Sequence, residues 1–355
     1  MSPVKSSKPV AVWLLAGVGM ILVQIILGGI TRLTGSGLSI TEWKPILGTL
    51  PPLNEQAWQT AFLKYQHIAQ FKQLNFQFTL SDFKSIYFWE WLHRLWGRLL
   101  GVVFLIPFII FLVQRRFHAG MVKPLLILFL LGALQGAVGW VMVLSGLNDE
   151  NVYVSHIRLA VHFMFALGLL VYTFWFALKL LVPQKRSIAH GVLKKFALVI
   201  LVLLVIQLTY GAFMAGLKAA TAAPTWPDIN GAFIPQNITT YQGRTMTFFS
   251  ALINNPIAVH VVHRNLAYLI FVLVLCWTVV AFNSRSSRLF NQWKWFPLFF
   301  VSLQVLLGIM AVLKSYRATP QGWGLFEWLA QLHQVVAILL LLSLVAVFRL
   351  LRVKG

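Results

Sequence analysis

The feature that most limits what this chain can fold into is a series of apolar runs, each long enough to cross a lipid bilayer as a helix. There are eight, at residues 9–31, 88–113, 122–145, 153–181, 192–216, 258–282, 293–314 and 327–350. Only 10% of the residues are charged, whereas about a quarter would be in a soluble domain. Because backbone polar groups inside a bilayer must be satisfied within the segment itself, the runs predict an all-α polytopic membrane protein with eight transmembrane helices.

The charges are divided between the two sides of these helices. If the N-terminus is cytoplasmic, all eight acidic residues fall in segments on the outer side. They are Glu42, Glu55, Asp82, Glu90, Asp149, Glu150, Asp228 and Glu327. Sixteen basic residues, from Lys5 to Lys354, fall on the cytoplasmic side, which is the positive-inside pattern and places both termini in the cytoplasm. Orientation in the bilayer thus accounts for the net charge of +21, so we expect no nucleic-acid partner.

No removable targeting segment is predicted, because the first apolar run is too long for a signal peptide and lacks a small-residue cleavage site. The simplest location is a bacterial cytoplasmic (inner) membrane. The single cysteine, Cys276, lies inside the sixth run, which excludes an intramolecular disulfide and a thiolate metal cluster. We expect it to be a small core residue.

The two halves of the chain contain similar segments in the same order. The segment HRLWGRLLG resembles HRNLAYLI, and the segment LQGAVGWVMVLSGL resembles LQVLLGIMAVLKS. The aligned residues are His93 with His263, Gln135 with Gln304, and His162 with His333. Because each half holds an even number of helices, the repeat is a parallel one. We therefore predict two pseudo-symmetric four-helix bundles, at residues 1–185 and 186–355.

Four histidines, two in each half, share one depth in the membrane. His93, His162, His263 and His333 each follow the start of an inward-running helix by one to two turns, on the order of 10 Å below the outer surface. A lone histidine in such a helix is usually an interhelical hydrogen-bonding residue. Two pairs at a repeated spacing favour facing ligands, which six-coordinate haem requires. Zinc would need a third ligand beside each pair, so we predict one haem in each half, near the outer face.

Arginines lie close to these histidines at the predicted outer boundary. They are Arg94, Arg98, Arg158 and Arg264. A guanidinium group binds carboxylates in a forked geometry, so these residues are candidates for binding haem propionates. For any one of them, an equally good interpretation is that it extends towards the lipid headgroups.

The two halves differ beside the histidines. Glu90 precedes His93 by three residues and shares its helical face, whereas the position aligned with Glu90 in the second half is His260. Only the first half therefore has a carboxylate for acid or base chemistry, and the second half is suited to holding a cofactor. A simple ion pair between Glu90 and Arg94 is the alternative.

These residues leave two classes of function open. One is an enzyme that oxidises the edge of a porphyrin in the first half. The other is a two-haem b-type cytochrome that exchanges electrons with quinone, in which both haems are permanent. A transporter is disfavoured, because the helices contain no pair interrupted by Pro or Gly at the membrane midplane.

Six segments together resemble the haem A synthases, over nearly the whole chain from residue 10. They are GGITRLTGSGLSITEWKPILGTLPP, EWLHRLWGRLLG, RLAVHF, LTYGAFMAGLKAATAAPTWPDINGAFIP, HVVHRNLAYL and LAQLHQ. The long first loop is similar to that of the branch found in alpha-proteobacteria and mitochondria. Two features depart from the family. The external cysteine pair of some members is missing, so electrons cannot pass through it, and AGLKAAT has Lys218 and Ala219 where a pair ending in glycine is expected.

The resemblance implies a reaction and a role for each residue. A methyl group of haem O is oxidised by way of a hydroxylated intermediate to a formyl group, with oxygen from water, to give haem A for cytochrome oxidase. His93 and His162 would hold the iron of haem O, and Glu90 would take a proton or trap the oxidised methyl. His263 and His333 would hold haem b as the electron exit. Haem O synthase would supply the substrate, cytochrome oxidase assembly would follow, and the electron acceptor is not identified.

The loops carry further expectations. The glycine-rich segment GGITRLTGSGLS (28–39) should close the first helix and cover the outer face of the first half, with Arg32 and Ser36 near a propionate; a plain turn is an equally good interpretation. The loop at 225–235 should do the same in the second half. The segments PPLNEQAWQTAFLKYQ (51–66) and TLSDFKSIYFWEW (79–91) are predicted to form short amphipathic helices at the membrane interface.

Overall fold

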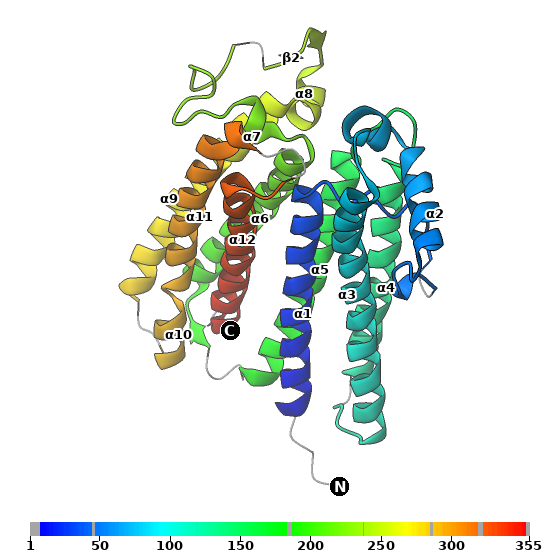
Figure 1. Ribbon diagram of the computed structural model, residues 1–355. Coiled ribbons are helices and arrows are strands. Elements are labelled where there is room, and N and C mark those ends of the chain that lie inside the picture. Colours follow the sequence, from blue (N-terminus) through cyan, green and yellow to red (C-terminus); the bar gives the residue numbers. More distant parts are fainter. Residues whose placement is uncertain are drawn as a thin grey trace. The chain divides into compact units, whose positions relative to one another are not determined.

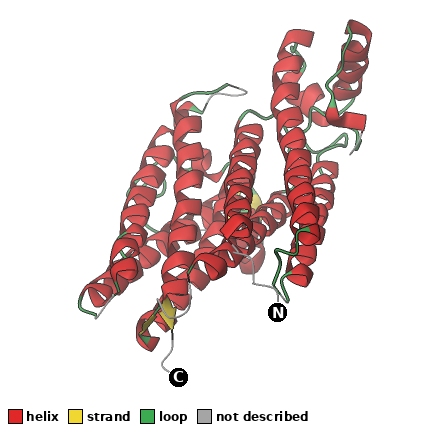
Figure 2. Cartoon of the chain, turned by 90° about the horizontal axis from the view of Figure 1, so that it is seen from below, coloured by secondary structure: helices red, strands yellow, loops and turns green. Residues whose placement is uncertain are grey.

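The computed structural model describes residues 8–44, 47–118, 120–182, 187–236, 238–284, 287–318 and 322–352, and most of this chain is helical (Figure 2). The helices are α1 (Lys8–Leu33), α2 (Glu55–Gln66), α3 (Leu80–Val113), α4 (Val122–Leu144), α5 (His156–Leu181), α6 (Gly191–Gly216), α7 (Ala219–Ala222), α8 (Phe248–Asn254), α9 (Pro256–Phe282), α10 (Arg288–Trp293), α11 (Phe296–Lys314) and α12 (Leu325–Leu350). The shorter elements are η1 (Leu47–Thr49), η2 (Phe71–Asn75), η4 (Ser315–Arg317), β1 (Ile188–Ala189), β2 (Thr240–Tyr241), β3 (Arg244–Thr245) and β4 (Leu351–Arg352).

Eight helices of the described chain are long and apolar enough to cross a membrane, which confirms the predicted all-α polytopic class. They are α1, α3, α4, α5, α6, α9, α11 with the α10 segment before it, and α12. The positive-inside orientation stays a prediction. Five of the basic residues on which it depends lie outside the described residues, namely Lys5, Lys185, Arg186, Arg285 and Lys354.

Helix α3 begins earlier than the apolar run at 88–113 suggests. The Thr79 side chain accepts from the Asp82 backbone N–H, while the Asp82 carboxylate accepts from the Thr79 backbone N–H at 2.9 Å. This capping box starts the helix at Leu80. The prediction of a separate interfacial helix at 79–91 is therefore wrong, because these residues form the first turns of α3. The other predicted helix is present as α2, and its place at the membrane interface stays a prediction.

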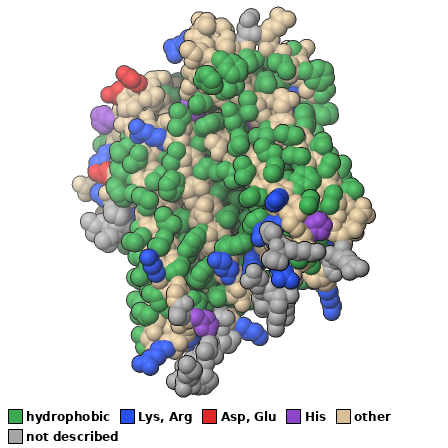
Figure 3. Space-filling view, turned by 180° about the vertical axis from the view of Figure 1, so that it is seen from behind, with side chains coloured by type: hydrophobic (Ala, Val, Ile, Leu, Met, Phe, Trp, Pro, Cys, Tyr) green, Lys and Arg blue, Asp and Glu red, His purple; other side chains and the backbone are tan. Residues whose placement is uncertain are grey.

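The surface of the long helices is rich in exposed apolar side chains, as the face in Figure 3 shows. Val113, Leu130 and Val192 are between 65% and 77% exposed, which suits contact with lipid. Cys276 also lies exposed on α9. Its prediction as a core residue is wrong, because an apolar run gives little indication of which side of a membrane helix faces lipid.

The chain divides into two compact units. Unit 1 is Met1–Leu170 with Pro320–Trp323, and unit 2 is Val171–Thr319 with Gly324–Gly355. In unit 1, α3 packs against α1 and α4; in unit 2, α9 packs against α6 and α11, and α12 packs against α11 and α6 (Figure 1). The division falls inside α5, so that His162 belongs to unit 1. The predicted boundary at 185 and 186 lies outside the described residues.

The segment between α1 and α3 in unit 1 is folded around aromatic side chains. Phe62 and Tyr65 of α2 pack against Phe83 of α3, with the Tyr65 and Phe83 ring centroids 5.3 Å apart. The Tyr65 hydroxyl donates to Gln70 at 2.9 Å and accepts from Asn75 at 2.7 Å. Burial raises the pKa of this phenol well above its usual value. This aromatic cluster fixes α2 to the start of α3, close to the residues that carry the candidate site.

The segment between α6 and α9 in unit 2 contains a β-hairpin. Strands β2 and β3 are antiparallel and are joined by Gln242 and Gly243, both with positive φ, as a two-residue hairpin turn requires. The N-terminus of α9 follows Asn255, whose side chain accepts from the Ile257 N–H, and Pro256 occupies the first helical turn. At the opposite ends of the unit 2 helices, β1 pairs in parallel with β4.

Candidate functional site

His93 lies on α3 in unit 1 and is held against α1. The side-chain amide nitrogen of Gln24 is 3.3 Å from His93 Nε2. One helical turn further along α1, a Cβ added to Gly28 would come within 3.2 Å of His93 Cε1, so a larger residue there would require the ring to shift by a few tenths of an ångström. Gly97 on α3 likewise leaves room for the Gln24 amide. The imidazole of His93 is thus fixed between an amide and a glycine of one neighbouring helix.

His162 lies on α5 and is held in the same way by α4. The Gln135 amide nitrogen is 3.2 Å from His162 Nδ1 and donates to the His162 backbone oxygen at 2.9 Å. A Cβ on Gly139 would come within 2.8 Å of His162 Cε1. Both predicted ligands of the first half therefore belong to unit 1, and each has a glutamine and a glycine from a neighbouring helix.

His263 lies on α9 in unit 2 and contacts α6. The Gln207 amide nitrogen is 3.4 Å from His263 Nε2 and donates to the His263 backbone oxygen at 3.0 Å. A Cβ on Gly211 would be 3.5 Å from His263 Cε1, which is an ordinary contact distance. This imidazole is less tightly confined on its glycine side than the two in unit 1.

His333 lies on α12 and contacts α11. The Gln304 amide nitrogen is 3.0 Å from His333 Nε2, and His333 Nδ1 is 3.0 Å from the Gln304 backbone oxygen. A Cβ on Gly308 would come within 2.9 Å of His333 Cε1. The His333 and His263 rings are 6.4 Å apart between centroids, with planes at 70°. The structure thus brings the two predicted ligands of unit 2 together.

One sequence pattern underlies all four sites. Each helix that faces a histidine carries a glutamine followed four residues later by a glycine, which places both on one helical face. The four pairs are Gln24 with Gly28, Gln135 with Gly139, Gln207 with Gly211, and Gln304 with Gly308. The sequence alignment detected Gln135 and Gln304 but assigned them no role, and it missed Gln24 and Gln207. A search for a repeated Gln-x-x-x-Gly would have found all four.

The histidine pairs fit a haem iron better than a metal that needs three side-chain ligands. Within the described ranges, no group of three or more His, Cys, Asp or Glu residues could hold a metal ion. Two imidazole nitrogens, each about 2 Å from a metal between them, put the ring centres on the order of 6 Å apart. The 6.4 Å between the rings of unit 2 is compatible with that arrangement. His93 Nδ1 and His263 Nδ1 are buried and have no hydrogen-bond partner in the described part of the chain, which leaves them suited to ligation.

Glu90 is buried on α3, one turn before His93, and only 2% of it is exposed. Its Oε1 accepts from Arg94 at 2.6 Å. Its Oε2 accepts from the Ser39 hydroxyl at 2.7 Å and from the Ile40 backbone N–H at 2.8 Å. The carboxylate is therefore a hydrogen-bond acceptor for both its own helix and the segment that follows α1. The ion pair with Arg94 is present, and it leaves open a second role for Glu90.

In unit 1, Arg94 and Arg98 both hold the segment that follows α1. Arg94 donates to the backbone oxygens of Ile40 and Glu42 at 3.0 and 3.1 Å, and its guanidinium lies over the Trp140 ring. Arg98 donates to the Lys44 backbone oxygen at 3.0 Å. The glycine-rich loop that follows α1 is thus fixed to α3 by guanidinium groups.

The corresponding arginine in unit 2 makes corresponding contacts. Arg264 donates to the backbone oxygens of Thr225, Pro227 and Asp228, and its Nη2 is 3.0 Å from His260 Nε2. His260 is buried and occupies the place that Glu90 has in unit 1. Outside the membrane-spanning helices, the Gly231 N–H and the Thr225 hydroxyl hold the pKa of the Asp228 carboxyl below its usual value.

Arg158 on α5 differs from the other three arginines. It is exposed and donates to the Val141 backbone oxygen of α4 at 2.9 Å. All four arginines thus contact backbone carbonyls, and the binding of haem propionates by any of them stays a prediction.

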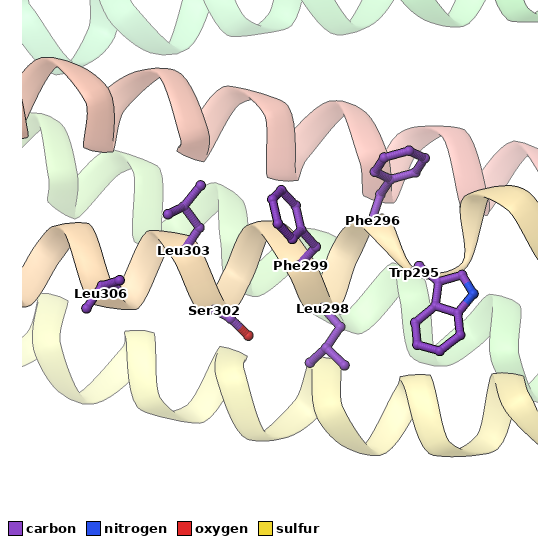
Figure 4. Close-up of a pocket in the computed structure, with 7 residues that line it drawn as sticks. All are labelled: Trp295, Phe296, Leu298, Phe299, Ser302, Leu303 and Leu306. Atoms are coloured by element: carbon purple, nitrogen blue, oxygen red, sulfur yellow. The ribbon is translucent and has the colours of Figure 1, made fainter.

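A hollow of about 700 Å³ lies along α11 and does not belong to these sites (Figure 4). Its lining residues are Trp295, Phe296, Leu298, Phe299, Ser302, Leu303 and Leu306. None of the four paired histidines lines it, and Trp295, Phe299 and Leu306 are more than half exposed. It is a depression on the apolar outer surface of α11.

The fold and the paired imidazoles define a class, the polytopic helical membrane proteins that carry histidine pairs on neighbouring helices. Residues 11–345 match the family model described as cytochrome oxidase assembly protein. The chain belongs to this family.

Similar proteins include several that carry the name haem A synthase. The one from Flavobacterium psychrophilum is 37% identical over 343 residues, which cover 95% of this chain and 96% of that protein. The one from Rhodospirillum centenum is 47% identical over 273 residues, covering 76% and 72% of the two chains. The one from Bartonella henselae is 37% identical over 346 residues, covering 97% and 93%.

Proposed function

We propose that this protein is a haem A synthase, a multi-pass enzyme of a bacterial cytoplasmic membrane that converts haem O to haem A. The match to the cytochrome oxidase assembly family over most of the chain and the similarity to relatives named haem A synthase support this function. In this proposal His93 and His162 of unit 1 ligate the iron of the substrate haem O. His263 and His333 of unit 2 ligate a resident haem b, which supplies one-electron transfer. Both haem sites lie near the outer face of the membrane.

The observation that carries the assignment of the two units is the buried carboxylate of Glu90. It lies one turn from His93, and His260 takes its place in unit 2. A methyl group and one water become a formyl group with the release of four electrons and four protons. The methyl carbon is oxidised, and a base near the substrate must accept protons. Glu90 is the buried carboxylate beside the histidines of unit 1, so unit 1 is the site suited to this oxidation.

The connecting segments are proposed to shield the two sites. Glu90 and Arg94 hold residues 39–42 against α3, and Arg264 holds residues 225–228 against α9. Exclusion of bulk water strengthens the electrostatic effect of Glu90 on a proton and limits side reactions of an oxidised methyl group. The four arginines lie close to the paired histidines in the sequence. They are therefore also candidates for binding the haem propionates.

The proposed partners follow from the reaction. Haem O synthase supplies the substrate, and the assembly of cytochrome oxidase consumes the product. The electrons leave through unit 2 to an acceptor outside this chain.

The test is extraction of the pigments from the purified membrane protein, with haems b, O and A resolved by chromatography and mass. Haem b together with haem O, haem A or a hydroxylated intermediate is the expected result. Two haem b per chain and no other pigment would overturn the proposal. It would instead establish a two-haem b-type cytochrome that exchanges electrons with quinone.

A further inference from the structure

The function proposed above gives no role to the glutamines that contact the four paired histidines. Each of Gln24, Gln135, Gln207 and Gln304 has its amide nitrogen within 3.0 to 3.4 Å of an imidazole nitrogen. Each also has a buried Oε1 atom that finds no hydrogen-bond partner among the described residues. Buried acceptors without a partner are rare in proteins, so four of them at equivalent positions require an explanation.

The hydrogen bond that a metal-bound imidazole needs explains these unpartnered acceptors. When iron binds one ring nitrogen, the other ring nitrogen carries a hydrogen and needs an acceptor, which fixes the ring orientation and raises the basicity of the ligand. A glutamine head group holds a donor and an acceptor on one carbon, and rotation by about 180° exchanges their places. The unpartnered Oε1 atoms are therefore acceptors at the position where a ligand imidazole needs one.

Other acceptors are scarce beside these rings. His333 has the backbone oxygen of Gln304 at 3.0 Å from its Nδ1. Each of the other three imidazoles has a glutamine amide as the only hydrogen-bond partner recorded for its ring in the described structure. The buried carboxylate one turn before His93 in unit 1, Glu90, already accepts from Ser39, Ile40 and Arg94.

Two of the glutamines have a further contact. Gln135 and Gln207 donate to the backbone oxygens of His162 and His263, and these two bonds are given up when the amide rotates to turn its oxygen towards the ring. The glycines four residues after Gln24, Gln135 and Gln304 let the imidazole lie close to the helix that carries the amide. The amide and the glycine together define one position for the ring.

We propose that Gln24, Gln135 and Gln207 are positioning residues for the histidine ligands, with the amide oxygen accepting the imidazole N–H when haem is bound. At His333 the backbone oxygen of Gln304, 3.0 Å from Nδ1, is the acceptor in their place. This inference rests on the proposed function, because it requires iron at the histidine pairs. The glutamines act through the histidines, and they tune the iron in both units by the same means.

The experiment uses Gln207 of unit 2, because the haem b proposed there is resident and can be measured without turnover. The full-length protein is purified as wild type, Gln207→Leu and Gln207→Glu. The midpoint potential and the low-spin electron paramagnetic resonance spectrum of haem b are then recorded. The control is Gln331→Leu, which removes a buried glutamine of α12 whose amide atoms contact no imidazole in the described structure.

We expect Gln207→Leu to weaken haem b retention on the order of tenfold, because an outer partner of a ligand is lost. We also expect a tenfold shift in preference towards ferrous iron, a rise of about 59 mV in the midpoint potential. Gln207→Glu keeps an acceptor, so it should retain haem and shift the potential and the resonance spectrum in the opposite direction. Gln331→Leu should leave both unchanged.

Two results would overturn the inference while leaving the proposed function intact. One is a wild-type-like potential and spectrum in Gln207→Leu. The other is loss of haem b from Gln207→Glu to the same degree as from Gln207→Leu, because a glutamine that acts only as a donor or as packing has that outcome. If the leucine variant does not accumulate, the glutamate variant alone decides through its haem content and spectrum. Absence of haem from the wild type would instead count against the proposed function.

Discussion

Units 1 and 2 hold their histidines by the same means but differ in the residue one turn before the first histidine of each pair. In unit 1 that residue is Glu90, and in unit 2 it is His260. Both are buried, and both contact the arginine that follows the histidine, Arg94 or Arg264. The difference is therefore confined to whether the buried group is a carboxylate or an imidazole.

The comparison separates two tasks that a buried polar cluster can perform. Holding a loop against the helix is common to both units, since Arg94 and Arg264 each donate to several backbone oxygens. It requires no carboxylate. In unit 1 the carboxylate that contacts this arginine, Glu90, also accepts from the loop, through Ser39 and Ile40. Both units share the arginine contacts with loop carbonyls. The Glu90 carboxylate is an additional group in unit 1, as is expected of an acid or base.

The largest effect is expected from removing a ligand in one unit at a time. Because the two pairs belong to separate units, His263→Ala should lose haem b and keep the substrate haem, and His93→Ala should do the reverse. Pigment extraction from each purified variant measures this. The exposed His67 gives the control substitution His67→Ala, which should keep both pigments. Equal loss of both pigments from each ligand variant would mean that the pairs are not independent sites.

Glu90→Gln tests the difference between the units most directly. Loss of a positioned acid or base costs about a hundredfold to ten-thousandfold in rate. We expect haem A formation to fall by that order, with haem O or a hydroxylated intermediate accumulating and both haem sites still filled. The matched substitution in unit 2, His260→Gln, should have a much smaller effect on product. Wild-type haem A formation by Glu90→Gln would remove the carboxylate from the mechanism.

The arginines should differ in their contribution to stability. Arg94→Leu leaves the buried Glu90 carboxylate without its cation, which costs about 3–5 kcal/mol for a buried pair. Arg264→Leu breaks hydrogen bonds to backbone carbonyls, as Arg94→Leu also does, but it leaves no buried charge without its partner. Arg158→Leu removes one exposed contact and should cost least. Thermal unfolding in lipid nanodiscs measures the order, and a larger loss for Arg264→Leu than for Arg94→Leu would contradict it.

The glycines offer a matched pair within unit 2. A Cβ at Gly308 would press on His333 at 2.9 Å, whereas a Cβ at Gly211 would meet His263 at an ordinary 3.5 Å. Gly308→Ala should therefore displace the imidazole, at a cost of about 1–3 kcal/mol typical of overpacking, and weaken haem b binding. Gly211→Ala should bind haem b nearly as the wild type does. Titration of each purified variant with haem measures this, and equal affinities would show that the glycine contact does not limit the ring.

The smallest effect is expected from the exposed ion pairs that Glu42 forms with Lys44 and Lys64 in unit 1. Hydrogen bonds from Lys64 and Lys44 hold the pKa of Glu42 below its ordinary value of 4.5. The ionised pairs therefore stabilise the folded form above that pH, and their contribution is lost as the pH falls through the lower folded-state pKa. Glu42→Gln should cost up to about 1 kcal/mol at neutral pH, as exposed pairs do. The variant and wild type should converge in acid; a constant difference across pH would mean that the charge plays no part.

The helices and the four histidines could be predicted because each is recognisable in the sequence, the helices by the length of their apolar runs and the histidines by their repeated spacing. An apolar run must be about one bilayer long, and the histidines recur at nearly constant offsets. Gln24 and Gln207 escaped notice because they precede the long loops, whose lengths differ, so that their separation of 183 residues does not match the 170 residues between His93 and His263.

The contacts of the arginines could not be predicted from the sequence. An arginine beside a histidine is compatible with a propionate, a lipid headgroup or a loop carbonyl, and only the folded loop shows that carbonyls of residues 40–44 and 225–228 are within reach. The exposure of Cys276 was also missed, since every face of an apolar run has a similar composition.

The pairing of β1 with β4 has a consequence for the order in which the protein is completed during synthesis. Ile188 and Ala189 lie immediately before α6 and find their partners only in Leu351 and Arg352, and the His190 N–H also donates to Arg352. The ribosome must therefore reach Arg352 before the segment that precedes α6 can be fastened. Both paired histidines of unit 1 precede β1 in the chain and both of unit 2 follow it, so the predicted ligands of unit 1 are synthesised first.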